Sequence, residues 1–160
     1  MESGSVMENK LRRFKAEDSE GVKSLILTIL AKEYPFDRTA YSDSDLDKIQ
    51  ETYGGQKESF FVIEEKDGIA GTVGIKEDSA TEALLRRLFV DPDHRKKGYG
   101  SALLERAVSF AKEKGYKKMY FRCTDRMGDA MRLCLSKGFK EKDNLEIGGF
   151  KIHVLELGLQ

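Results

Sequence analysis

The chain has 160 residues, enough for one domain with at most a small appendage. Hydrophobic residues make up 39% and charged residues 35%, a mixture that excludes both a disordered chain and a membrane-embedded one. Lysine plus arginine number 28, and so do aspartate plus glutamate, so the basic excess of a sequence-independent nucleic-acid binder is missing. We expect a single domain over residues 1–160 that binds no nucleic acid, with residues 1–6 outside the ordered fold because Met7 offers a second start.

Targeting and metal-binding signals are absent from the sequence. The first ten residues lack an apolar core of secretory length, and the longest apolar stretch, 25–31, is too short to cross a bilayer. Cys123 and Cys134 have no CxxC spacing and no nearby histidine pair, which argues against a zinc site or a disulfide framework. We therefore expect a cytoplasmic protein without a metal ion and without a membrane partner.

Apolar residues recur at helical or alternating spacing along the chain, and glycines, prolines and turn pairs separate the runs. The acidic residues Glu17, Asp18 and Glu20 favour a helix start, and Asp67-Gly68 favours a hairpin between two β-rich runs. The predicted elements are a strand at 11–14, helices from about 17 to 33 and from about 42 to 53, strands at 59–63, 69–75 and 83–90, a helix at 99–114, a strand at 118–123, a helix at 127–137, and a terminal hairpin of strands 139–145 and 150–157. This order predicts one mixed α/β domain.

The segment from Leu88 to Leu104 carries the clearest chemical signal. A strand ends at Pro92, a basic loop with Arg95, Lys96 and Lys97 follows, and a helix begins at once beside two glycines, Gly98 and Gly100. Free backbone N–H groups at a positive helix end suit a phosphate, and glycine lets an anion approach the backbone. The residues indicate an anion site, with a pyrophosphate as the natural ligand; the alternative is a tight turn with surface basic residues. Neither Gly-x-Gly-x-x-Gly nor a P-loop is present.

The same segment follows the pattern Val-x-Pro-x-x-Arg-x-x-Gly-x-Gly-x-x-Leu-Leu, from Val90 to Leu104. This pattern resembles the acyl-CoA-binding signature of the GNAT superfamily of N-acyltransferases, and Ala130–Phe139 resembles a second motif of that family. The element order is similar to the GNAT fold along essentially the whole chain. The resemblance implies an α/β domain with a central, largely antiparallel, splayed sheet flanked by helices, and acetyl-CoA as the cofactor.

The resemblance also implies which residues bind the cofactor. The backbone of the strand residues is expected to pair with the pantetheine arm, and the loop with the start of the helix is expected to wrap the pyrophosphate. Ser101 would add a hydroxyl, Arg95 and the two lysines would reach the ribose phosphate, and Tyr99 is expected to pack or face solvent rather than bind through its ring. The implied cofactor-binding residues are Leu88, Phe89, Val90, Arg95, Lys96, Lys97, Gly98, Tyr99, Gly100 and Ser101.

The sequence departs from the family pattern at its catalytic positions. Many members carry a tyrosine, thought to protonate the departing CoA thiolate, where Cys134 stands. Cys134 is either that proton donor or a small apolar side chain that packs in the core. The family slot for a general base falls on Leu84, so the candidates are Glu82, Asp125 or a chain of water molecules, and either acid is otherwise a solvated surface carboxylate.

The two histidines are not expected to act in catalysis. We expect His94 to lie at the surface and His153 to be a satisfied sheet residue.

Two features bear on the acceptor and point in different directions. Aromatic and acidic residues gather after the first predicted helix, and an aromatic and acidic rim would favour a cationic amine; these residues are Tyr34, Phe36, Asp37, Tyr41, Asp43 and Asp45. The alternative is that the aromatics cover the core and the acids begin a helix. Arg86 and Arg87 lie on opposite faces of a regular strand, so one of them could meet an anionic group on the acceptor.

Together these observations predict an acetyl-CoA-dependent N-acetyltransferase. The acetyl group would pass to a primary amine of a small molecule or a protein by direct attack within a ternary complex. The resemblance implies that the amide of Val90 polarises the thioester carbonyl. Homodimers are common among such proteins, but no residue of the sequence demonstrates one. The alternative is a non-catalytic acyl-CoA-binding sensor or partner module of the same fold; a nucleotide-binding protein is a third reading that rests only on Gly-x-Gly.

Overall fold

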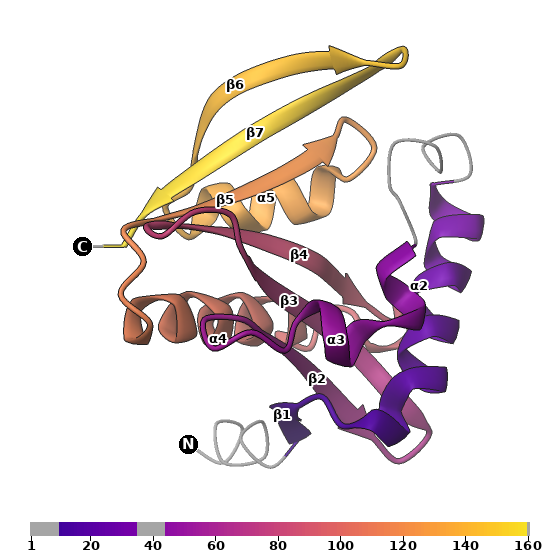
Figure 1. The fold of residues 1–160 in the computed structure, drawn as a ribbon. Coiled ribbons are helices and arrows are strands. Elements are labelled where there is room, and N and C mark those ends of the chain that lie inside the picture. The colour runs from indigo at the N-terminus through magenta and orange to yellow at the C-terminus, as the bar shows by residue number, and fades with distance from the viewer. Residues whose placement is uncertain (1–9, 35–43, 160) are drawn as a thin grey trace.

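The computed structural model describes residues 10–34 and 44–159, which form one sheet with helices on both faces (Figure 1). The strands are β1 (Leu11–Arg13), β2 (Ser59–Glu65), β3 (Gly68–Glu77), β4 (Glu82–Val90), β5 (Lys118–Thr124), β6 (Lys140–Ile147) and β7 (Phe150–Gly158). The α-helices are α2 (Ser19–Glu33), α3 (Ile49–Thr52), α4 (Tyr99–Glu113) and α5 (Gly128–Ser136), with 3₁₀ turns η1 (Ala16–Asp18), η3 (Ser44–Asp47) and η4 (Pro92–His94).

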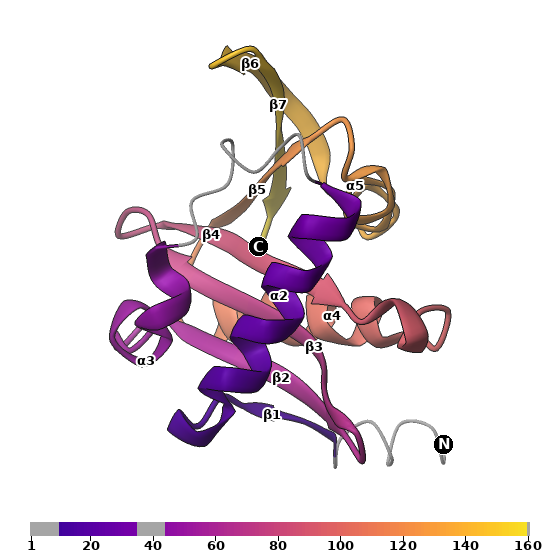
Figure 2. The ribbon, with the colours of Figure 1, turned by 90° about the vertical axis from the view of Figure 1, so that its right-hand side faces the viewer.

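The seven strands follow the order β1-β2-β3-β4-β5-β7-β6, and β4 with β5 is the parallel pair among antiparallel neighbours. Helices α2 and α3 cover one face of the sheet, and α4 and α5 lie on the other (Figures 1 and 2). The predicted fold class, a largely antiparallel sheet flanked by helices, is therefore confirmed. Within the described residues, no helix is long and apolar enough to cross a membrane.

Most predicted elements occur within one or two residues of their expected bounds, but the second helix differs. Instead of one polar helix, the chain forms η3 and then the single turn α3, because Lys48 between them has a non-helical backbone (φ −139°). The apolar side chains of this segment, Leu46, Ile49 and Tyr53, are all buried. Tertiary burial of these side chains, rather than helical propensity, therefore sets the shape of the segment.

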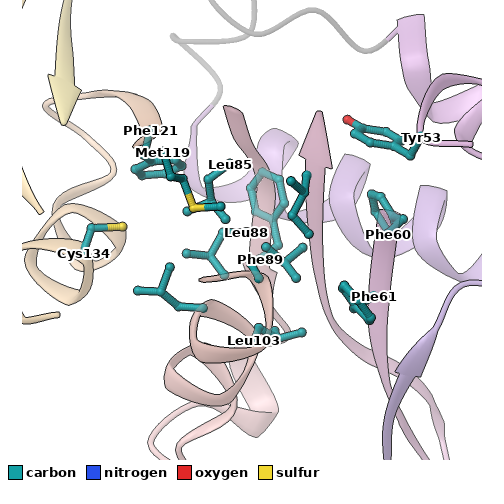
Figure 3. Close-up of a cluster of buried hydrophobic side chains, with 14 of the residues drawn as sticks. Tyr53, Phe60, Phe61, Leu85, Leu88, Phe89, Leu103, Met119, Phe121 and Cys134 are labelled. Carbon is teal, nitrogen blue, oxygen red and sulfur yellow. The ribbon is translucent and has the colours of Figure 1, made fainter. Parts of the chain in front are cut away.

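The hydrophobic core lies on both sides of β3 and β4. Figure 3 shows a part of this core. On the side of α4 and α5, it includes Leu85 and Leu88 of β4 and Met119 of β5. Leu103 of α4 and Cys134 of α5 are fully buried there. This packing fills one face of the β4–β5 region with apolar side chains.

Candidate active site

The parallel strands β4 and β5 separate partway along their length. Their register covers Glu82–Leu85 against Lys118–Phe121 and ends at the pair Leu85 and Phe121. Figure 1 shows the two strands diverging beyond that point. The last residues of β4, Arg86 to Val90, therefore have no partner strand on the β5 side among the described residues. The expected splaying of the sheet beside this strand is confirmed.

Val90 turns its backbone polar groups toward this split. Asp91 N donates to Ala70 O (2.8 Å), which makes Gly71 and Val90 a non-hydrogen-bonded pair of the antiparallel ladder. The N–H and C=O of Val90 consequently point away from β3. The carbonyl accepts from Arg95 Nε (3.1 Å), so the N–H is the group that Val90 presents to the split.

Phe89 does the opposite. It is registered with Thr72, and the alternation of the ladder directs its backbone groups to β3. Of these two adjacent residues, only Val90 can pair through its backbone with a ligand in the split. The sequence analysis expected both residues to pair with the pantetheine arm and did not distinguish Phe89 from Val90.

A β-bulge shapes β4 at the split. The register of β3 with β4 shifts between Thr72 and Gly74, and Arg87 has a left-handed backbone (φ 55°). Thr72 Oγ1 donates to the carbonyl of Arg87 (2.7 Å), so the group that the bulge removes from the ladder still has a partner. The bulge bends β4 where β5 leaves it.

The side chain of Arg87 is buried in an ion pair with Asp45 of η3. Nε of Arg87 lies 3.1 Å from Oδ2 of Asp45, and a second guanidinium nitrogen contacts Oδ1. Tyr53 OH also donates to this carboxylate (2.7 Å). Burial by itself would raise the pKa of Asp45, but the hydrogen bonds from Arg87 and Tyr53 lower it. Asp45 is thus a buried counter-ion rather than part of an exposed acidic rim.

Arg86 and Arg87 lie on the same face of the sheet. Arg86 is registered with Gly74, and a Cβ on Gly74 would be 2.8 Å from the ring of Tyr53, so this position faces α3. Arg87 reaches Asp45 beside the same ring. The expectation that the two arginines point to opposite faces was wrong, because the bulge interrupts the alternation of the strand.

The loop before α4 has the backbone of an anion site. Lys96 (φ 66°) and Gly98 (φ 82°) are left-handed, and no backbone acceptor is found in the described chain for the N–H groups of Lys96, Lys97 and Gly98. The first bond of the helix runs from Ala102 N to Gly98 O (3.0 Å), and no side chain caps the helix start. Several N–H groups without a backbone acceptor in the described chain therefore lie at the positive end of α4.

The two glycines of this loop have different roles. A Cβ on Gly98 would meet no atom within 4 Å, so Gly98 borders open space. A Cβ on Gly100 would be 3.2 Å from Leu133 of α5, so Gly100 permits close packing of two helices. The open approach, the free N–H groups and the exposed Lys96 and Lys97 fit a pyrophosphate.

Arg95 is engaged with the protein itself. Besides the bond to Val90, its Nη2 lies 3.0 Å from Glu33 at the end of α2. The side chain thus ties the end of β4 to α2. The expected contact of Arg95 with the ribose phosphate would require this ion pair to open.

Tyr99 packs, as expected, and His94 does not lie at the surface. Tyr99 is 5% exposed, donates its hydroxyl to Glu65 and receives Lys10 Nζ at 3.4 Å. The His94 ring stacks on it with centroids 6.2 Å apart and is only 8% exposed. The expectation of an exposed His94 was wrong because the stack with Tyr99 and the nearby Asp67 bury the ring.

Cys134 is fully buried on α5. Burial raises the pKa of its thiol to about 12, and Cys123 nearby adds to the shift. A group without solvent contact and with this pKa fits the packing alternative better than proton donation. Its role in catalysis stays a prediction, for which a test is given below.

Glu82 lies at the closed end of the β4–β5 pair. It is registered with Lys118 and contacts Tyr120 OH at 3.5 Å. At about 3.3 Å per residue, Glu82 is roughly 13 Å along β4 from Arg86, where the split opens. A proton could reach Glu82 from there only through intervening water.

Asp125 and His153 form a separate cluster at the far end of β5. The two ring nitrogens of His153 contact Asp125 and Glu141, the latter at 2.7 Å, and His153 is 7% exposed. The prediction of a satisfied sheet histidine is confirmed. The hydrogen bonds that the ring donates to Asp125, the larger effect, and to Glu141 raise the pKa of His153. No three metal-binding side chains gather anywhere in the described chain.

The structure describes only some of the aromatic and acidic residues that were expected to form a rim for the acceptor. Phe36, Asp37, Tyr41 and Asp43 lie outside the described residues, whereas Tyr34 packs against the core. Sequence reasoning missed Arg122, which follows the last registered residue of β5. The register of two parallel strands joined through a helix carries no local signal, so only the structure brings Arg122 opposite Arg86.

Comparison with known proteins agrees with this geometry. The model of the acetyltransferase (GNAT) family matches residues 24–139. Human N-acetyltransferase 8 is 31% identical over 104 residues, which is 61% of this chain but only 46% of that protein, so the chain matches about half the length of this relative. The uncharacterized N-acetyltransferase YjgM of Escherichia coli K12 is 25% identical over 83% of both chains.

Solved structures share the fold at low sequence identity. An acetyltransferase from Streptococcus agalactiae superposes with a TM-score of 0.83 at 16% identity, covering 94% of this chain and 98% of that one. YncA from Salmonella typhimurium, solved with acetyl-CoA, has a TM-score of 0.75 at 19% identity and covers 94% and 93%. The match of the family model over most of the chain shows that this protein belongs to the acetyltransferase (GNAT) family.

Proposed function

We propose that this protein is an acetyl-CoA-dependent N-acetyltransferase that acetylates a primary amine by direct attack within a ternary complex. The observation that carries the proposal is the split between β4 and β5, with the Val90 N–H facing it and the open N-terminus of α4 at its mouth. Relatives named N-acetyltransferase and a structural neighbour solved with acetyl-CoA support the same activity.

Each part of the site has a physical task. Acetyl-CoA supplies the activated acyl thioester. The N–H groups around Gly98 would hold its pyrophosphate, and the edge of β4 would hold its pantetheine arm as an added strand. The N–H of Val90 would donate to an oxygen in the split, where negative charge develops during attack by an amine.

The attacking ammonium must first lose a proton. No carboxylate of the described residues lies at the opening of the split without a partner, since Asp45 is bound to Arg87, Asp125 is bound to His153, and Glu82 lies four residues before Arg86 at the closed end of β4. We therefore assign deprotonation to water, with Glu82 as the acid at the end of the relay. Positioning of the amine then supplies much of the rate.

Ligand-dependent melting with a matched pair of glycine variants tests the cofactor site. At a hundredfold excess over Kd, acetyl-CoA or CoA should add about 2.7 kcal/mol of stability, roughly 5–10 °C, whereas ATP and NAD should add none. Gly98→Leu should abolish the shift. Gly115→Leu is the control, because Gly115 also has a left-handed backbone (φ 83°) and open space around it but lies at the other end of α4. Equal shifts in both variants would refute the pyrophosphate site.

An amine screen tests the transfer itself by the release of free CoA. Release that depends on an added amine, with acetylated amine as the product, is the expected result. Binding of acetyl-CoA without release with any amine would instead favour the non-catalytic acyl-CoA-binding module, which the buried Cys134 at the position of the family tyrosine would explain.

A further inference from the structure

Two arginines flank the point where the sheet opens. The last registered pair of β4 and β5 is Leu85 with Phe121, so Arg86 and Arg122 are the first residues beyond it on the two strands. Neighbouring strands are about 4.8 Å apart where they pair, and the separation grows from this pair onward. Arg86 and Arg122 therefore stand opposite each other at the vertex of the split.

Both arginines project from the same face of the sheet. Arg86 shares the face of α3, as the contact of its partner position Gly74 with Tyr53 shows. On β5, Tyr120 contacts Glu82 on β4, so Tyr120 and Glu82 share a face, and Arg86 and Arg122 follow them by the alternation of each strand. Arg122 is exposed and Arg86 is partly exposed.

The described chain balances the positive charge of these two side chains only in part, because Arg86 acts through its charge on Asp45, and that carboxylate is already bound by Arg87. Neither Arg86 nor Arg122 makes a hydrogen bond or an ion pair with any residue of the described chain. The carboxylates of this face already have cations: Asp45 is bound by Arg87, and Glu156 by Lys118 at 3.2 Å and Lys142 at 3.8 Å. Glu82 faces Lys118 in the register.

Among the described residues, apolar side chains close one face of the vertex to an acceptor. On the opposite side of the vertex, the buried apolar side chains of Leu85, Leu88 and Met119 lie near Leu103 of α4 and Cys134 of α5 (Figure 3). The amine must therefore enter on the face of α2 and α3, past Arg86 and Arg122. Two guanidinium groups that form no ion pair within the described residues would repel a polyamine there and attract an anion.

We propose that the acceptor is an amine that also carries a carboxylate, which Arg86 and Arg122 bind while the amine faces the split. The planar, forked guanidinium matches a carboxylate with two parallel hydrogen bonds, which suits a small amino acid or a related amino carboxylate. The proposal rests on the N-acetyltransferase activity proposed above, and it names the class of substrate for that activity.

Kinetics with paired acceptors test the proposal. The probes are the L-α-amino acids and β-alanine, each compared with its own carboxamide, which keeps the amine and removes the charge. At least one acid should be acetylated with a kcat/KM ten or more times that of its amide. Because the carboxylate is bound equally before and during attack, Arg86→Gln and Arg122→Gln should raise the KM of the acid at least tenfold with little change in kcat and little effect on the amide.

The controls separate this proposal from the activity on which it rests. Arg132→Gln on α5 removes an exposed arginine outside the site and should behave as the wild type. Arg86→Lys keeps a positive charge, so its KM for the acid should lie between the KM of the wild type and that of Arg86→Gln. Turnover of uncharged amines or spermidine without preference for any acid overturns the carboxylate proposal but leaves the acetyltransferase intact. Equal loss on acid and amide in the two glutamine variants also overturns it. Failure to release CoA with any amine overturns both.

Discussion

The buried ion pair of Arg87 and Asp45 allows a direct test of how much this pair stabilises the β4 bulge at Arg87. Asp45→Asn keeps the shape and an acceptor for Tyr53 but removes the charge opposite a guanidinium that is 7% exposed. A buried cation without its counter-ion costs about 3–5 kcal/mol. For a domain of this size, where 1 kcal/mol corresponds to about 2–4 °C, the melting temperature should fall by roughly 6–20 °C.

The same turn supplies a matched control. Asp47 pairs with Lys23 across the surface, with side chains 65% and 41% exposed, so Asp47→Asn should cost no more than about 1 kcal/mol. Urea unfolding of both variants gives the free energies directly. If Asp45→Asn does not fold, the double variant Asp45→Asn/Arg87→Leu decides, because it removes both charges and should be more stable than Asp45→Asn alone.

Two results would refute this reasoning. One is a cost for Asp45→Asn within 1 kcal/mol of the cost for Asp47→Asn, which would mean that water reaches the guanidinium. The other is a double variant less stable than the single one, which would mean that Arg87 is stabilised by contacts other than the carboxylate.

Three further variants probe the surroundings of the site. His153→Gln should lower the melting temperature most at about pH 5–6 and less at pH 9, because a raised histidine pKa contributes stability that is complete below the ordinary value of about 6.5 and is lost as pH rises through the folded value. The lowered pKa of Asp125 keeps that carboxylate charged at pH 5–6, so the pair with His153 persists there. Tyr99→Phe should cost about 1–2 kcal/mol in urea unfolding, because Glu65 loses a donor, with the affinity for CoA unchanged. Cys134→Ala should keep kcat within about threefold, measured by CoA release.

Each of these expectations has an outcome that contradicts it. A pH-independent effect of His153→Gln would show that the imidazole is neutral in the folded protein. A tenfold loss of CoA affinity in Tyr99→Phe would assign the hydroxyl to the cofactor rather than to Glu65. A hundredfold loss of kcat in a folded Cys134→Ala protein would make the thiol the proton donor.

The sequence by itself determined the class of fold and the cofactor loop. Alternation and helical spacing are local, so the strands and the long helices, α2 and α4, occur where their apolar residues predict them. The strand, loop and helix from Val90 to Leu104 could be predicted for the same reason, because they are adjacent in the chain. Gly98 and Gly100 act there through their own backbone.

Only the tertiary structure decided which side chains meet. The bulge at Arg87 reversed the expected face of that residue, because its left-handed backbone depends on Thr72 and Asp45, which are distant in sequence. The burial of His94 likewise depends on distant residues, because Tyr99, on which it stacks, is held by Glu65 of β2, and Asp67 of the β2–β3 turn lies beside the ring. The placement of Arg122 opposite Arg86 comes from the register of two parallel strands joined through α4, and such a register depends on packing between elements, for which no short stretch of sequence carries a signal.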